Sequence, residues 1–236
     1  MTLIELKDAP KDLISSVRFA PASPILLTTS WDAQLRIYDA RRDHGTLHSH
    51  ITYKAPLLDA CWDRTGGNST AYVAGFERRV YAVDIEQGKT TPIGRDHNRA
   101  IKAVVHHIEY FNLPGTPQHE KYAFKCHRIV DKSPNAVDTV TPVNAIAFHP
   151  TYGTFFSGGS DAVVCLWDFQ ARKRMKQYPR FPASVLALDV DSTGTMLAVG
   201  VSDDAYKENP IELGPAPKAS AVFVRYLAAE EARGKA

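Results

Sequence analysis

The amino-acid sequence predicts an all-β fold of the β-propeller class, and an internal repeat is the main observation behind this prediction. Three landmarks recur without a gap at an offset of 129 residues: Pro21 and Pro150, Asp32 and Asp161, Asp39 and Asp168. That offset equals three periods of about 43 residues, the usual length of one propeller blade. Short β-rich runs bounded by turn residues fill each copy, as expected for stacked antiparallel sheets.

The first unit, predicted as a blade over residues 12–40, shows the pattern most completely. It contains a strand, a turn, a second strand, a tight turn at Ser30-Trp31-Asp32 and a third strand that ends in Tyr38-Asp39. Asp32 therefore occupies the turn between the second and third strands, and Trp31 lies on the same turn.

The second unit spans about residues 57–85 and ends at Asp84, which lies 45 residues after Asp39. Its first strand is predicted from Leu57 to Trp62. The Trp62-Asp63 pair ends a first strand rather than a third, so it is interpreted as a coincidence of composition.

The third unit, over residues 101–130, is incomplete. A strand pattern runs from Ile101 to Phe111 without the turn that should separate first and second strands. Two arrangements follow: an open arc that keeps seven-blade spacing, or a strained five-bladed ring. The arc, or a ring with a visible gap, is favoured because closure would leave sheet edges only partly covered.

Two more units complete a single domain of residues 1–236, with four recognisable blades and one partial blade. The penultimate blade covers residues 143–178: Asp161 takes the tight turn, and Trp167-Asp168 ends the third strand, with the Trp ring between sheets. The last blade covers residues 184–227. Residues 2–6 alternate as a strand should, so they are predicted to close this blade and join the two ends of the chain.

Composition excludes several classes of function. The 236 residues include 44% hydrophobic residues, with no long apolar run and no N-terminal signal pattern, which argues against membrane insertion and secretion. Cys61, Cys126 and Cys165 lack paired spacing, so reduced thiols in an intracellular compartment are expected. The net charge of +2 is too small to indicate nucleic-acid binding.

No motif indicates an enzyme, a metal or a cofactor. The chain contains no Gly-rich phosphate loop, no Gly-x-Ser-x-Gly and no paired Cys-x-x-Cys. Asp203-Asp204 does not predict an acid–base pair, because adjacent residues of an extended chain point apart. A non-catalytic platform that receives peptides is therefore predicted.

Several segments resemble one family, the mitotic checkpoint WD-repeat proteins of the Bub group, and in particular its kinase-free propeller member. The segments are Ile14–Phe19, Thr29–Asp32, Leu35–Asp39, Lys121–Arg128 and Pro142–His149, with Ser202–Lys207 similar to the fungal branch. The resemblance covers both ends of the chain. It breaks near Val105, where about a hundred residues of the seven-blade family pattern are missing.

The resemblance implies a role in the spindle assembly checkpoint, in the nucleus and at the mitotic kinetochore. Trp31 would contact the GLEBS motif of checkpoint kinases, although an aromatic cap on a blade turn explains it equally well. Arg128, with Lys125 and His127, would bind phosphorylated repeats of a kinetochore scaffold, since Arg presents a permanently charged planar fork to phosphate. Strand alternation puts Lys125 and His127 on one face and Arg128 on the other, so not all three can contact one phosphate.

Two alternatives remain open. A related propeller of nuclear-pore mRNA export shares Phe124–Arg128 but usually lacks the Ser-Trp-Asp turn. The missing centre also fits an inactive truncated checkpoint product.

Overall fold

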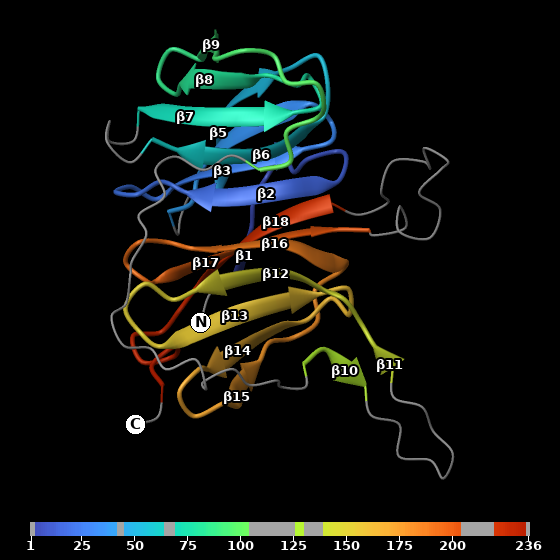
Figure 1. Ribbon diagram of the computed structural model, residues 1–236. Helices are drawn as coiled ribbons and strands as arrows, with labels where there is room; N and C mark the ends of the chain where they lie inside the picture. The colour runs from blue at the N-terminus through green and yellow to red at the C-terminus, as the bar shows by residue number, and fades with distance from the viewer. Residues whose placement is uncertain are drawn as a thin grey trace, which may run out of the picture.

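The computed structural model describes residues 3–41, 45–63, 69–103, 126–129, 139–203 and 220–234. Within these residues every regular element is a strand, which confirms the predicted all-β fold. Four antiparallel sheets of four strands lie one after another in a stack (Figure 1).

The four sheets follow the repeats of the sequence. In chain order they are β2 (Ile14–Phe19), β3 (Ile25–Ser30), β4 (Gln34–Asp39) and β5 (Thr46–Thr52); β6 (Leu57–Trp62), β7 (Thr70–Gly75), β8 (Val80–Asp84) and β9 (Lys89–Ile93); β12 (Val143–Phe148), β13 (Thr154–Gly159), β14 (Val164–Asp168) and β15 (Lys173–Gln177); and β16 (Ser184–Val190), β17 (Met196–Ser202) and β18 (Ser220–Tyr226) with β1 (Leu3–Glu5). We call these sheets blades and name each by its first strand: the β2, β6, β12 and β16 blades.

The N-terminal strand belongs to the C-terminal blade. β1 pairs with β18 in antiparallel register, with Ile4 opposite Val224. The first and last strands of the chain therefore share one sheet, and β1 covers the outer edge of β18. Covering an edge in this way removes a row of unpaired backbone groups that would otherwise pair with other chains.

The blades contact one another in a fixed order. Contacts join β12 and β13 to β16, β16 and β17 to β2, and β2 and β3 to β6. The β12 and β6 blades consequently lie at opposite ends of the stack (Figure 1). In each blade we call the side that faces the preceding member of this order the leading face, and the other side the trailing face.

The apolar core lies between the blades. One buried cluster joins the β12 and β16 blades around Phe156, a second joins the β16 and β2 blades around Val17, and a third joins the β2 and β6 blades around Leu27. Each blade is thus held by burial of its faces against its neighbours, the main source of stability for stacked sheets.

The predicted partial blade is only partly described. Ile101–Ala103, the start of the predicted strand, have no strand structure, so the prediction is wrong for these residues. The remainder, to Phe111, lies outside the described residues. Among the described residues β10 (Arg128–Ile129) pairs only with β11 (Thr139–Val140), as a separate two-stranded ladder.

Asp189 places a titratable group between two blades. Its Oδ2 accepts the backbone N–H of Phe19 at 2.7 Å, across the boundary between β16 and β2. Burial raises the pKa of Asp189 to about 6, against the effect of that hydrogen bond and of Arg18. The charged form is therefore disfavoured in the folded protein.

We expect the contribution of Asp189 to the free energy of unfolding to fall between about pH 4 and pH 6 and to level off above that range. The folded-state pKa lies above the unfolded value, so the unfolded chain binds fewer protons in this interval and rising pH favours it. Asp189→Asn should lessen this slope and stabilise the protein by about 1 kcal/mol at pH 7. This is less than the roughly 3 kcal/mol to which a pKa shift of about two units corresponds, because Asp189 is partly exposed. Urea unfolding at several pH values measures the slope; equal slopes in wild type and variant would contradict the assignment.

Candidate functional site

The same tight turn recurs between the second and third strands of three blades. In each turn a carboxylate residue is followed by a non-glycine residue with positive φ: Asp32 and Ala33 at 62°, Glu77 and Arg78 at 62°, Asp161 and Ala162 at 60°. Such a conformation is costly for a residue with a Cβ and persists only where surrounding contacts fix it. Those contacts differ from blade to blade.

In the β2 blade the turn is held by an ion pair. Asp32 Oδ2 lies 2.7 Å from Arg36 Nη2 and also accepts the backbone N–H of Lys11 at 2.9 Å, while Oδ1 accepts that of Gln34 at 3.1 Å. Burial opposes ionisation of Asp32, but these donors outweigh it and hold its pKa below the ordinary value. Asp32 therefore has a structural role as a charged acceptor.

In the β12 blade a chain of hydrogen bonds holds the equivalent turn. Asp161 Oδ1 lies 2.8 Å from His127 Nδ1, His127 Nε2 lies 2.9 Å from Ser157 Oγ, and Trp167 Nε1 donates to the same Oγ at 2.8 Å. The neutral imidazole fits these roles when Nδ1–H donates to the carboxylate and Nε2 accepts the serine hydroxyl. These hydrogen bonds connect the turn to the middle of the sheet.

This geometry corrects the prediction for His127. The side chain is buried, with 3% of the residue exposed, and both ring nitrogens have protein partners. It is therefore not available to a phosphate. Strand alternation fails here because His127 has a φ of 45°, which lets both Cys126 and His127 contact the β12 blade.

The other predicted phosphate-binding residues have different positions. Lys125 lies outside the described residues. Arg128 is partly exposed and begins β10, where it pairs with Val140. The structure does not bring Arg128 together with Trp31, which lies on the β2 blade.

The aromatic-Asp ends of the third strands have structural contacts. Trp167 is buried, and Asp168 Oδ1 accepts the backbone N–H of Ala171 at 2.8 Å. Asp39 accepts the N–H of Arg41 in the same way, at 3.0 Å. Each carboxylate thus accepts a backbone N–H of the turn that leads into the fourth strand.

Trp31 forms part of an aromatic pair. Its ring meets that of Phe76 edge to face, with centroids 5.7 Å apart. Phe76 occupies the same turn position in the β6 blade as Trp31 does in the β2 blade, and it is exposed. Phe76 is not among the site residues predicted from the sequence; its register with Trp31 in the repeat is the signal that identifies it.

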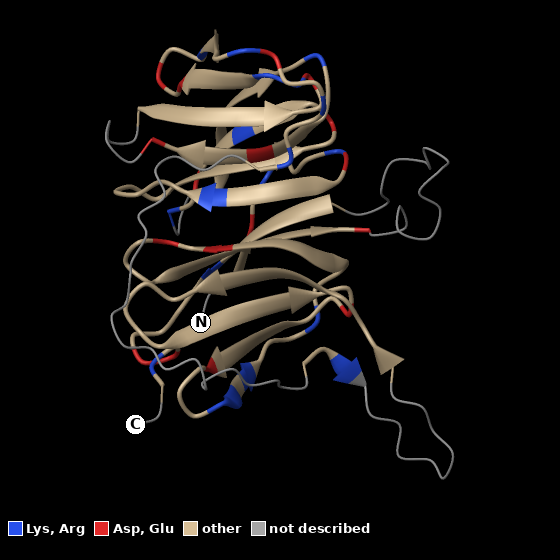
Figure 2. Ribbon diagram, in the orientation of Figure 1, with Lys and Arg blue, Asp and Glu red and all other residues tan. Residues whose placement is uncertain are grey.

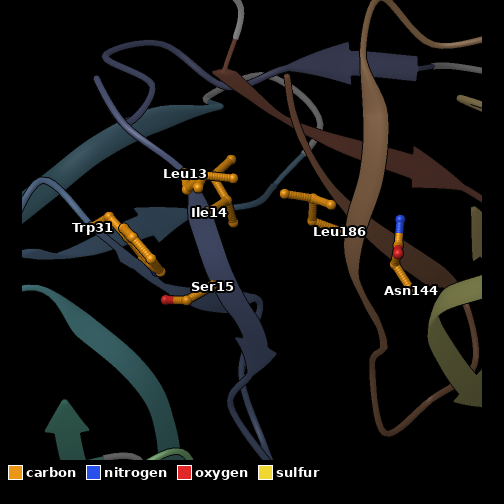
Figure 3. Close-up of a pocket in the computed structure, with 6 residues that line it drawn as sticks. All are labelled: Leu13, Ile14, Ser15, Trp31, Asn144 and Leu186. Atoms are coloured by element: carbon orange, nitrogen blue, oxygen red, sulfur yellow. The ribbon is translucent and has the colours of Figure 1, made fainter. Parts of the chain in front are cut away.

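A cavity of about 210 Å³ lies beside Trp31 (Figure 3). Its lining residues are Leu13, Ile14, Ser15, Trp31, Asn144 and Leu186. Three of these share one structural feature: Ser15, Asn144 and Leu186 are the extra residues of β-bulges at equivalent points of β2, β12 and β16. A bulge re-aims a side chain out of the alternating pattern, which here turns all three toward one space.

Two bulge residues also link neighbouring blades. Asn144 Nδ2 donates to the carbonyl oxygen of Val185 at 2.9 Å, and Ser15 Oγ donates to that of Leu57 at 2.9 Å. Both acceptors precede the bulge of the next blade. The cavity is therefore built on rigid elements, as precise binding sites require.

The arrangement of the aromatic pair and the cavity suits recognition of a peptide more than catalysis. The half-buried Trp31 and the exposed Phe76, beside a small pocket, offer apolar contact with a few polar partners. In the described part of the chain no group of three His, Cys, Asp or Glu side chains is placed to hold a metal ion. The described residues also include no helix long and apolar enough to cross a membrane.

Comparison with known proteins agrees with the repeats and the sheets. The model of the family "WD domain, G-beta repeat" matches residues 3–39 and 135–168. The fold and the turn geometry therefore define a WD-repeat β-propeller protein.

Individual relatives show to which family of WD-repeat proteins the chain belongs. Mitotic checkpoint protein BUB3.1 of Arabidopsis thaliana is 32% identical over 94% of this chain and 68% of its own length, and mitotic checkpoint protein bub3 of Dictyostelium discoideum is 30% identical over 85% and 65%. The Poly(A)+ RNA export protein of Schizosaccharomyces pombe is 27% identical over 89% and 65%. The chain belongs to the Bub3 family of WD-repeat proteins, and it spans about two thirds of the length of these relatives.

Proposed function

We propose that this chain is a non-catalytic adaptor of the spindle assembly checkpoint that acts in the nucleus and at the mitotic kinetochore. Family membership is the observation that carries this proposal: two similar relatives are mitotic checkpoint proteins, and the similarity extends over most of this chain. The rigid stack of blades supports the same role, because it presents turns and sheet ends as fixed surfaces for peptides.

The surface around Trp31 is our candidate for binding the GLEBS motif of checkpoint kinases. Trp31 and Phe76 present aromatic area on two adjacent blades, next to the cavity lined by Leu13 and Leu186. Buried aromatic anchors in such a position commonly dominate the energy of an interface. Phe76 therefore extends the predicted contact from one residue to a pair.

Arg128 is our candidate for binding phosphorylated repeats of the kinetochore scaffold, with Lys125 as a second cation. Arg128 is partly exposed at the start of β10, although the Nε atom of its guanidinium is buried. A guanidinium can make two parallel, charge-assisted hydrogen bonds to a phosphate. His127 is not included, because its ring is buried in the β12 blade.

Reciprocal variants test the two sites in one calorimetric experiment. Trp31→Ala should weaken binding of a kinase GLEBS peptide by about 30-fold and leave binding of a phosphorylated scaffold peptide unchanged. Arg128→Ala should weaken the phosphopeptide by about 10-fold to 100-fold and leave the GLEBS peptide unchanged. Phe169→Ala and Arg180→Ala remove an exposed aromatic ring and an exposed charge elsewhere, and serve as matched controls.

The mRNA-export alternative has its own support, the similarity to the Poly(A)+ RNA export protein. A GLEBS peptide from a nucleoporin distinguishes the two roles: the checkpoint proposal requires tighter binding of the kinase peptide. Tighter binding of the nucleoporin peptide would favour export. Binding of neither peptide by a folded protein would identify the chain as an inactive truncated checkpoint product.

A further inference from the structure

The residues that follow the last strand connect two blades. Residues 227–234, which we call the C-terminal segment, leave β18 of the β16 blade, form no further strand and lie beside the β12 blade (Figure 1). Ala232 is buried, and its carbonyl oxygen accepts the hydroxyl of Thr154, at the start of β13, at 2.8 Å. The segment therefore crosses from the blade that precedes it in the chain to the neighbouring blade.

Glu231 anchors the C-terminal segment through a buried carboxylate. Its Oε1 lies 2.7 Å from Lys176 Nζ on β15 and 3.0 Å from Arg225 Nη2 on β18, while Oε2 accepts the backbone N–H of Ala228 at 3.1 Å. The side chain of Glu231 is only 3% exposed, whereas that of Glu230 beside it is 67% exposed. One carboxylate thus bridges two blades, and its neighbour is in solvent.

The two cations and a tyrosine ring form a site for that carboxylate. Lys176 extends from the trailing face of the β12 blade and Arg225 from the leading face of the β16 blade, and they lie 5.2 Å and 4.6 Å from the ring centroid of the buried Tyr178. Burial opposes ionisation of Glu231, but its ion pairs and the N–H of Ala228 outweigh this effect and hold its pKa below the ordinary value. Fixed cations of this kind select an anionic side chain.

The surface around the site is basic on the side of the β12 blade. β15 carries Lys173, Arg174 and Lys176 but no acidic residue, and Figure 2 shows these charges along the strand. Lys173 and Arg174 are exposed, as is Arg172 just before the strand. A local excess of positive charge favours the approach of an acidic ligand.

The C-terminal segment is attached in a way that lets it open without the blades. Its backbone N–H groups at Glu231 and Arg233 donate within the segment, to the carbonyl oxygens of Ala228 and Glu230. Glu230 and Arg233 also pair with each other in solvent. Beyond Leu227, burial is confined to the side chain of Glu231 and to Ala232. Segments with so few buried contacts open locally at a free energy below that of global unfolding.

We propose that Lys176, Arg225 and Tyr178 form a binding site for acidic peptides of partner proteins, and that the C-terminal segment is an internal ligand that closes this site. The class of ligand follows from the present occupant: a peptide with Glu followed by a small apolar residue reproduces Glu231 and Ala232. Opening of the segment and binding of such a peptide are competing events, so the segment sets the apparent affinity of the site.

This site is separate from the surface around Trp31. Thr154, which bonds the C-terminal segment, begins β13, whereas the tight turn of Asp161 follows the end of that strand. The equivalent turn in the β2 blade carries Trp31. The site and the aromatic pair therefore lie at opposite ends of the strands, and a test of one is independent of the other.

A synthetic peptide of residues 227–234 tests the site in the full chain. Glu231→Arg sets a positive charge against two cations and should release the segment, so this variant should bind the peptide about 10-fold more tightly than wild type does. Glu230→Arg changes an exposed side chain and should bind as wild type does. Lys176→Ala added to Glu231→Arg should reverse the gain, whereas the exposed Lys173→Ala should not. Fluorescence anisotropy measures each affinity.

Changes in the peptide identify which carboxylate the site binds. In the peptide, Glu231→Gln should weaken binding to the released chain by about 10-fold, and Glu230→Gln should leave it unchanged. Equal affinities of these two peptides would overturn the proposal. A Glu231→Arg chain that binds the peptide no better than wild type does would also overturn it.

Hydrogen exchange of the wild-type chain measures the opening without any substitution. The amide of Glu231, which is bonded within the segment, should exchange through local opening, at a rate that low concentrations of urea leave unchanged. The amides of β18 should exchange more slowly and should accelerate with urea, because they open with the blade. A common rate and a common urea dependence for both groups would show that the segment opens only with the blades, and would contradict its role as a releasable ligand.

Discussion

Replacing His127 by Ala is expected to destabilise the protein by about 3 kcal/mol. The substitution leaves the largely buried carboxylate of Asp161 without its ring partner and removes the acceptor of the Ser157 hydroxyl. Loss of one partner from a buried polar network costs more than the net strength of the bond, because the remaining groups stay desolvated. Urea unfolding followed by two spectroscopic probes measures the change.

A double-variant cycle distinguishes the free energy of the hydrogen-bond network from the effect of a smaller side chain. Asp161→Asn in the His127→Ala background should cost clearly less than it does in wild type, since the two residues contact each other directly. His48→Ala, on the exposed face of β5, should leave stability unchanged. If His127→Ala kept wild-type stability but lost phosphopeptide binding, the original prediction for His127 would be restored.

Replacing Gly158 by Ala is expected to destabilise the protein by a similar amount, about 3 kcal/mol. A Cβ at this position would lie 2.3 Å from Val185 Cγ1 and 3.0 Å from its Cβ. Val185 is fully buried in β16, so neither blade can move away without opening the cluster between them. Overpacking of a buried contact typically costs 1–3 kcal/mol, and here it strains a whole blade interface.

Gly153→Ala provides the matched control for Gly158→Ala. Gly153 lies in the turn before β13, and the nearest atoms to an added Cβ are side-chain atoms of Gln170 at 4.0 Å. We expect a change within about 0.5 kcal/mol for this variant. Equal melting temperatures for Gly153→Ala and Gly158→Ala would show that the β12 and β16 blades are not packed as described. The same denaturation series can include both variants.

Much of the fold is encoded locally. The recurring strand and turn patterns placed four sheets, because a strand needs only alternating residues and a turn needs only a few polar ones. Asp32 and Asp161 could be located at their turns from the spacing of the landmarks alone. The family similarity followed from the same segments.

The partners of those turns could not be predicted in this way. Asp161 is held by His127, 34 residues earlier in a segment without repeat pattern, whereas Asp32 is held by Arg36 in the strand that directly follows its turn. His127 was placed on the wrong face because a positive φ interrupts the alternation on which the prediction depended. The repeat places Phe76 in register with Trp31, but the contact between the two rings joins neighbouring blades and appears only in the tertiary structure.

The sequence by itself determined the all-β fold, the repeat and the tight turns, all of which depend on residues close together in the chain. The tertiary structure decided which equivalent residues are covered. Phe19 and Phe148 occupy the same position of the repeat, yet one is buried and the other exposed. Burial depends on which blade packs against each face, and that neighbour is set by the order of the stack rather than by the local pattern.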